Sequence, residues 1–77
     1  MTRLPRVSGK DVVSALTRAG FALVHIRGSH HYLRKEGTGK IVVVPVHGKS
    51  TVPLGTLKSI LRQANLTVEE FVEFLSS

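Results

Sequence analysis

Two adjacent histidines follow a Gly-Ser pair in the first half of the chain, at Gly28-Ser29-His30-His31. Glycine followed by serine is typical of the two-residue turn of a β-hairpin, and such a turn would place both histidines at the start of a strand. Because side chains alternate between the two faces of a strand, we expect His30 and His31 to lie on opposite faces. If Leu33 points into the core, His30 is the histidine that faces solvent.

On that exposed face, Tyr32 and Arg34 would accompany His30, and the three residue types together suit RNA cleavage. An imidazole can transfer a proton near neutral pH, a guanidinium can bind a phosphate, and an aromatic ring can stack on a base. Spacing alone favours a plainer interpretation, because a Gly-Ser-His motif is short and also fits an exposed polar corner of a hairpin. The motif by itself therefore identifies a candidate site and leaves its role open.

The other two histidines carry weaker signals. His25 lies within the mostly apolar segment 21–27, which favours a half-buried structural role. His47 lies in a basic loop, where RNA contact, a second proton carrier and plain exposure all stay open. We expect no metal and no cofactor, because the chain has no cysteine, no regular zinc-ligand spacing and no cluster of carboxylates near the histidines.

Positive charge is concentrated in residues 1–66, which hold all eleven Lys and Arg residues and only two acids, a net charge of +9 against +6 for the whole chain. Such a charge attracts polyanions, and phosphate contacts supply most of the non-specific affinity for nucleic acid. Arg34, Lys40 and Lys49 are the candidate phosphate ligands. We expect no membrane partner, because no apolar run approaches the ~20 residues that a membrane span requires.

Three short segments rich in apolar and β-branched residues predict an antiparallel sheet, with tight turns between them. The segments are residues 21–27, 30–35 and 41–44. The third segment is β-branched throughout, which suggests a central strand or one covered on both faces, and Pro45 ends it.

Helical periodicity flanks the three strands. Ser8 is expected to cap a first helix, and Gly20 ends it. Pro53 suits the first turn of a second helix, for which Asn65 serves as the C-cap. A capping box at Thr67-Val68-Glu69-Glu70 begins a short third helix.

These elements predict an α+β fold in which the two longer helices cover one face of a three-stranded antiparallel sheet. The order α-β-β-β-α, with a short C-terminal helix, is the layout of the double-stranded-RNA-binding domain. The length suits one domain over residues 1–77. The absence of cysteine fits a reducing compartment, and no apolar stretch follows the first basic residues as in a signal peptide, so we expect a cytoplasmic protein.

Across about residues 5–70 the chain resembles the HicA toxins, also called YcfA-like proteins, which are mRNA interferases of toxin–antitoxin systems. Each motif that carries the resemblance is modest, and their shared order makes it specific. The motifs are Ser8-Gly9-Lys10, Ala19-Gly20-Phe21, Gly28-Ser29-His30-His31, Ile41-Val42-Val43-Val44-Pro45-Val46-His47 and Leu54-Gly55-Thr56-Leu57-Lys58-Ser59-Ile60-Leu61-Arg62.

The resemblance implies the toxin of a type II system, a metal-independent endoribonuclease that cleaves mRNA and is neutralised by a HicB-type antitoxin. The family's catalytic histidine follows the Gly-Ser pair and corresponds to His30, with Gly28 and Ser29 as the turn that positions it. Some members keep their histidine one residue later, so His31 is the reserve candidate.

Three questions stay open at the level of the sequence. The second proton carrier is one of His31, His47, water, or His30 of another subunit. The same fold and charge also fit a non-catalytic RNA- or DNA-binding module. A domain that binds only a protein partner is a third possibility.

Overall fold

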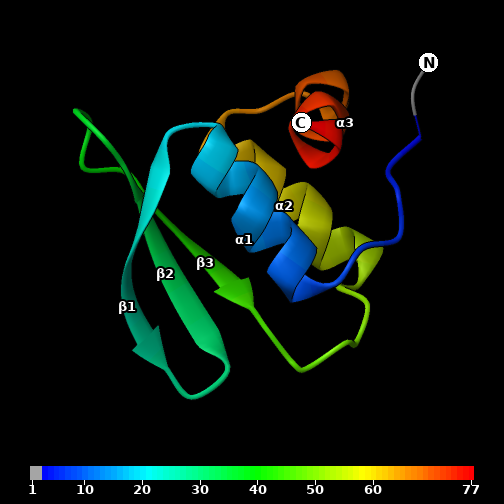
Figure 1. Cartoon of the computed structure of the whole chain (residues 1–77), viewed down its shortest axis with the longest axis horizontal. Coiled ribbons are helices and arrows are strands. Elements are labelled where there is room, and N and C mark those ends of the chain that lie inside the picture. Colours follow the sequence, from blue (N-terminus) through cyan, green and yellow to red (C-terminus); the bar gives the residue numbers. More distant parts are fainter. Residues whose placement is uncertain (1–2) are drawn as a thin grey trace.

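The computed structural model describes residues 3–77 and contains a three-stranded antiparallel sheet and three helices (Figure 1). In chain order the elements are α1 (Gly9–Arg18), β1 (Phe21–Arg27), β2 (His30–Lys35), β3 (Ile41–Pro45), α2 (Leu54–Ala64) and α3 (Val68–Ser76). The predicted α+β class and the order α-β-β-β-α with an added C-terminal helix are confirmed. No helix in the described part of the chain is long and apolar enough to cross a membrane.

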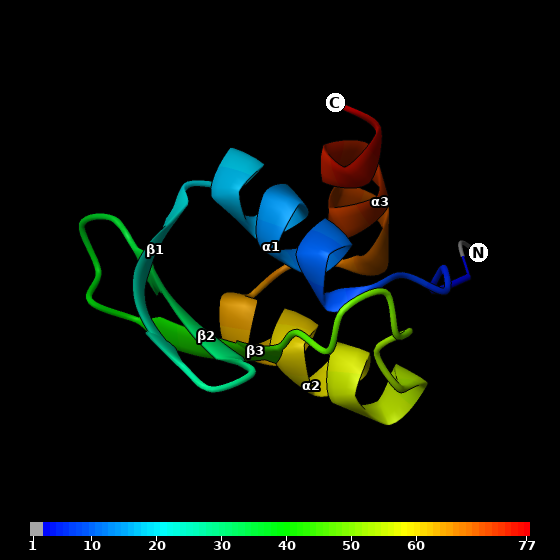
Figure 2. The same ribbon diagram turned by 60° about the horizontal axis from the view of Figure 1, so that its bottom comes forward.

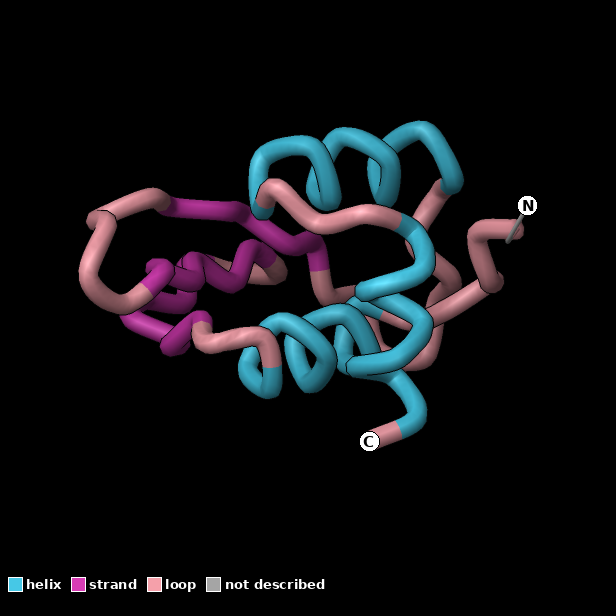
Figure 3. The backbone as a smooth tube through the Cα atoms, turned by 90° about the horizontal axis from the view of Figure 1, so that it is seen from above, coloured by secondary structure: helices cyan, strands magenta, loops and turns pink. Residues whose placement is uncertain are grey.

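The helices gather on one side of the sheet (Figures 2 and 3). Helix α1 contacts all three strands, α2 packs on β3, and α3 packs on α1. One hydrophobic cluster fills the space between these elements, and its largest fully buried side chains are Phe21, Phe71, Leu16, Leu33, Leu57, Val12, Val42 and Val44. Within residues 3–77 no element covers the opposite face of the sheet, so that face is open to solvent.

The strand order is β1-β2-β3, so β2 is the central strand and β3 lies at an edge. This corrects the prediction that the β-branched run 41–44 forms a central or doubly covered strand. Val42 and Val44 are buried under the helices, whereas Ile41, on the other face, is 49% exposed. The run is apolar on both faces although only one face is covered, which is why its composition was misleading.

The helix ends follow the sequence signals closely. The Ser8 hydroxyl accepts a hydrogen bond from the backbone N–H of Asp11 at 3.2 Å, and the Asp11 carboxylate accepts one from the backbone N–H of Ser8 at 3.2 Å. Gly20, with φ +102°, follows the C-cap of α1, and Asn65 caps α2 in the left-handed conformation. Pro53 is the N-cap residue of α2, one position before the first helical residue and not within the first turn as predicted.

Helix α1 begins in direct contact with the end of β3, at Gly9. A Cβ atom on Gly9 would overlap the carbonyl oxygen of Pro45 and lie 2.8 Å from the Cα atom of Val46. Only glycine allows this approach of helix to strand. Pro45 is the register partner of His30, so the contact holds the end of the sheet that carries the candidate histidine.

Candidate active site on the open face of the sheet

A tight turn sets the position of His30. Gly28 has φ +60° and Ser29 does not have a positive φ, which is the pattern of a type II′ turn with glycine at its first central position. The carbonyl oxygen of Ser29 accepts a hydrogen bond from the backbone N–H of Val46 at 2.7 Å. The turn is thus hydrogen-bonded to the segment after β3. His30, the next residue, pairs with Arg27 on β1 and with Pro45 on β3, so its backbone is flanked by a strand on each side.

The predicted alternation along β2 is confirmed. Leu33 is fully buried in the core, His30 is exposed, and His31 is partly buried. His30 therefore projects from the open face, which no helix within residues 3–77 covers, while His31 lies on the face that α1 covers.

Strand register places cations and aromatic rings together on the open face. Arg27 on β1 lies directly opposite His30, and His25 lies opposite Tyr32. Side chains of directly opposed residues have Cβ atoms about 4.5–5.5 Å apart, so each pair is in contact range. Arg34 follows two residues beyond Tyr32 on the same face of β2. None of the three strands, which the structure describes in full, contains an Asp or Glu.

His25 corrects the prediction of a half-buried structural role. It is exposed, and its ring centroid lies 5.4 Å from that of Tyr32, with the two rings tilted by 52°. The cause is an irregularity in β1: Leu23 pairs with Leu33, but the next pair is His25 with Tyr32, which leaves Val24 as an extra residue. Strict alternation from Leu23 would have turned His25 toward the helices, and the bulge turns it to the open face.

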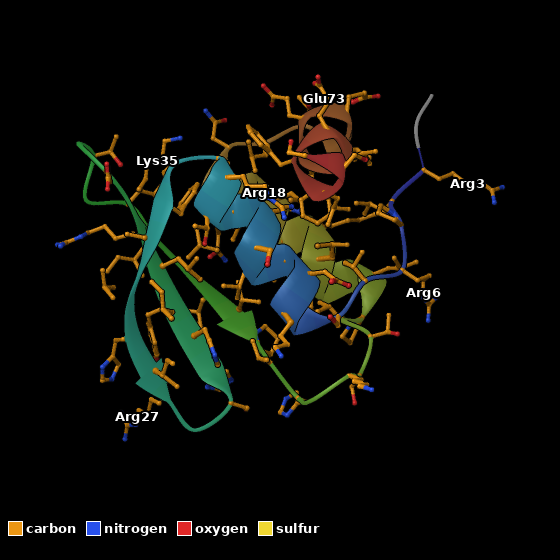
Figure 4. All side chains as sticks on the ribbon, viewed as in Figure 1. Arg3, Arg6, Arg18, Arg27, Lys35 and Glu73 are labelled. Atoms are coloured by element: carbon orange, nitrogen blue, oxygen red, sulfur yellow. The ribbon has the colours of Figure 1, made fainter. Side chains whose placement is uncertain are left out.

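Arg27 lies beside His30, and sequence reasoning had not assigned Arg27 a role. The two-residue turn contained a signal for the positions of both Arg27 and His25. Counted outward from that turn, the hairpin register pairs Arg27 with His30 and His25 with Tyr32 without reference to the rest of β1. In Figure 4 Arg27 lies at the hairpin end of the sheet and projects away from the helices.

The reserve candidate, His31, lines a separate groove between α1 and the first hairpin. The groove has a volume of about 270 Å³, and α1 contributes Lys10, Val13 and Ser14 to its wall. The Nδ1 atom of His31 is buried and finds no hydrogen-bond partner among residues 3–77. His30 and His31 therefore face different surroundings on opposite sides of one strand.

The three candidate phosphate ligands are all exposed, and they lie at different distances from His30. Arg34 shares the open face with His30, four residues and about 14 Å along β2. Lys49 lies in the loop that follows β3, at the same end of the sheet as His30. Lys40 precedes Ile41, the register partner of Arg34, so it lies at the far end of the sheet. The structure brings together His30 and Arg34 on one face and places Lys40 away from them.

One basic residue of β2 has a structural role. The Lys35 ammonium donates a hydrogen bond to the carbonyl oxygen of Ala19 at 2.8 Å and lies 5.2 Å from the centroid of the Phe21 ring. It thereby joins the end of β2 to the C-terminal end of α1, as its position in Figure 4 illustrates. This cation points to the helical side of the sheet and not to the open face.

No three His, Asp or Glu side chains within residues 3–77 gather closely enough to hold a metal ion. The chemistry available on the open face is that of two imidazoles, two guanidinium groups and a phenol ring. These groups can transfer a proton, hold a phosphate and stack on a base.

Comparison with known protein families assigns most of the chain to one family model. A family model described as the HicA toxin of bacterial toxin–antitoxin systems matches residues 9–66. The matched segment includes α1, all three strands and α2, and hence His30, His31 and the glycine turn. No curated protein matches the chain.

Proposed function

The chain belongs to the HicA family of toxins from bacterial toxin–antitoxin systems, and we propose that it acts there as a metal-independent endoribonuclease that cleaves mRNA through His30. Membership of this family implies an antitoxin partner. The proposal adds to the family assignment a reaction, a substrate and a catalytic residue.

The observation that carries the proposal is the setting of His30. The imidazole is exposed on a sheet face that no described helix covers, directly opposite Arg27, and on strands without a carboxylate. A phosphodiester can approach such a face without repulsion from fixed negative charge. The tight turn and the pairing on both sides hold the backbone of His30 in place, as positioned acid–base catalysis requires.

The reaction is a transesterification within the RNA chain. The ribose 2′-oxygen attacks the adjacent phosphorus and forms a bond to it, while the bond from phosphorus to the 5′-oxygen of the next nucleotide breaks. His30 accepts the proton of the 2′-hydroxyl as general base, or donates a proton to the departing 5′-oxygen as general acid. Arg27, opposite His30, stabilises the negative charge that builds up on the phosphate oxygens.

A complete reaction needs both proton transfers, and one histidine performs one of them at a time. His31 is on the other face of β2, so it is poorly placed for the same phosphodiester. Of the carriers that the sequence left open, water, His47 and His30 of a second subunit remain. Arg34 and Lys49 hold flanking phosphates, and Lys40 adds charge at the far end of the sheet.

The antitoxin in this proposal is of the HicB type, and both proteins act in the cytoplasm. The net charge of +9 over residues 1–66 favours rapid association with an acidic partner surface. An antitoxin that covers the open face would hide His30 and exclude RNA in one step.

The direct test is to express this protein alone and then together with its antitoxin, while growth and mRNA integrity are followed. We expect growth arrest and mRNA cleavage with the toxin alone, and neither when the antitoxin is present. The purified protein should cleave the same mRNA without other factors. Purified protein that binds RNA tightly and leaves it intact would contradict the proposal and favour a non-catalytic RNA-binding module.

A further inference from the structure

The centre of the open face is an aromatic pair that the cleavage mechanism does not use. Tyr32 lies on the central strand, with His25 opposite it on β1 and Val43 opposite it on β3. His25 is exposed and Tyr32 is partly buried, and their ring centroids are 5.4 Å apart. The pair lies outside the hydrophobic core cluster, and no described helix covers it, so packing of the fold does not explain it.

The neighbours of this pair favour an anionic ligand with flat faces. Arg27 and His30 occupy the next position toward the turn, and Arg34 occupies the next position away from it. A single strand of RNA offers both features, because each nucleotide joins a stackable base to a charged phosphate. An acidic protein surface would match the charge as well, but the alternation of flat rings and cations along the strand matches the alternation of bases and phosphates in a single strand of RNA.

The distance between the pair and His30 fits adjacent parts of one strand. Two residues along a β-strand span about 7 Å, so a base stacked over Tyr32 sits one step from His30. A base can stack there only if its faces are free, and the base faces are inaccessible in an RNA duplex. The arrangement therefore selects an unpaired nucleotide.

We infer that Tyr32 and His25 form a stacking platform that binds an unpaired base of single-stranded RNA and so places the neighbouring phosphodiester at His30. This inference rests on the proposed ribonuclease function and adds the binding subsite and the strandedness of the substrate to it. It gives His25 a role in binding RNA.

The test uses a short single-stranded RNA that carries one 2-aminopurine, whose fluorescence is quenched by stacking on an aromatic ring. The protein carries His30→Ala so that the RNA stays intact. Tyr32→Phe keeps the ring and Tyr32→Leu removes it at similar volume. We expect the Tyr32→Phe variant to quench the fluorescence and to bind the RNA with unchanged affinity. We expect the Tyr32→Leu variant to lose the quenching and to bind the RNA about 5- to 100-fold more weakly. Binding of a fully paired duplex should differ little between the two variants.

Arg62→Ala, on the exposed side of α2, is the matched control for general electrostatic effects, and it should leave quenching unchanged. Thermal unfolding verifies that each variant is folded. Should Tyr32→Leu fail to fold, His25→Ala at the exposed position replaces it and is expected to reduce quenching.

Failure of the inference and failure of the proposed function give different results. Suppose that the wild-type protein cleaves RNA, and that the Tyr32→Leu variant quenches the 2-aminopurine fluorescence and binds the RNA as the Tyr32→Phe variant does. The platform is then disproved and the nuclease proposal stands. If ring-dependent quenching is found but the wild-type protein cleaves no RNA, the platform is supported and the catalytic proposal fails.

Discussion

At the scale of single residues, two neighbouring histidines differ because they lie on opposite faces of one strand. His30 projects from a face that is open to solvent, where its loss leaves no cavity. His31 lines the groove beside α1, with a buried Nδ1 atom that has no hydrogen-bond partner in the described part of the chain. The same residue type is therefore exposed at one position and partly buried beside α1 at the next.

Replacement of each histidine by alanine should separate these roles. His30→Ala should lower the rate of RNA cleavage by about 10²–10⁴-fold, the usual contribution of general acid–base catalysis. Its free energy of unfolding should change by less than about 1 kcal/mol, as for most exposed substitutions. His31→Ala should cost more stability, about 1–2 kcal/mol, and less activity. Cleavage of one RNA and thermal unfolding of both variants measure the two effects.

Full activity of His30→Ala, or unfolding of the domain by this change, would show that His30 is not the catalytic residue. Loss of cleavage in His31→Ala with stability unchanged would move the active site to the groove beside α1.

At the scale of secondary-structure elements, contacts between segments decide where the site residues point. The extra residue in β1, Val24, directs His25 and Arg27 to the open face. The close approach of α1 to the end of β3 requires a glycine at position 9, and it supports the strand end that pairs with His30.

Two glycine-to-alanine changes within helices should have opposite effects on stability. Gly9→Ala would drive a methyl group into the backbone of Pro45 and Val46, so we expect destabilisation by about 1–3 kcal/mol. Gly55→Ala, in α2, meets nothing within 4 Å, and the higher helix propensity of alanine should stabilise the protein by up to about 1 kcal/mol. Denaturant unfolding measures both changes. Equal effects of the two substitutions would refute the steric argument for Gly9.

At the scale of the whole molecule, positive and negative charge are concentrated in different parts of the chain. Residues 1–66 carry all eleven bases, whereas α3 carries three of the five acids. Helix α3 packs on α1 and buries Phe71 in the core. The Arg18 guanidinium, which lies beside α3 in Figure 4, also donates a hydrogen bond to the carbonyl oxygen of Phe74 at 2.8 Å. The acidic helix thus lies on the helical side, away from the open sheet face.

Binding of single-stranded RNA should weaken steeply as salt rises. Contact with four or five phosphates implies a slope of about −3 in a plot of log affinity against log salt concentration. The measurement is a titration of the His30→Ala variant, which leaves the RNA intact, over a range of salt concentrations. A flat plot would mean that the positive charge does not contact the RNA backbone.

RNA cleavage should persist in EDTA, because the proposed mechanism transfers protons through His30 and needs no metal-bound water. The experiment compares cleavage by the purified protein with and without the chelator. Activity that disappears with EDTA and returns with one added divalent ion would disprove the metal-independent mechanism.

The sequence by itself determined the elements of this protein and their order. Capping residues such as Ser8 and Asn65, the turn glycine Gly28 and the hydrophobic periodicity act over a few residues, so they can be read without the fold. For the same reason alternation along one strand placed His30 and Leu33 on opposite faces, so that an inward Leu33 implied an exposed His30.

Only the tertiary structure decided which strand lies at the edge, which face of the sheet the helices cover and where the alternation along β1 is interrupted. The edge position of β3 depends on strand order, which the composition of residues 41–44 does not report. The steric need for Gly9 arises from Pro45, which is distant in sequence. The bulge at Val24 lets Phe21 face the core while His25 and Arg27 face the open side, and it is not apparent from the sequence, because a single-residue shift in pairing moves every later side chain to the other face of the sheet.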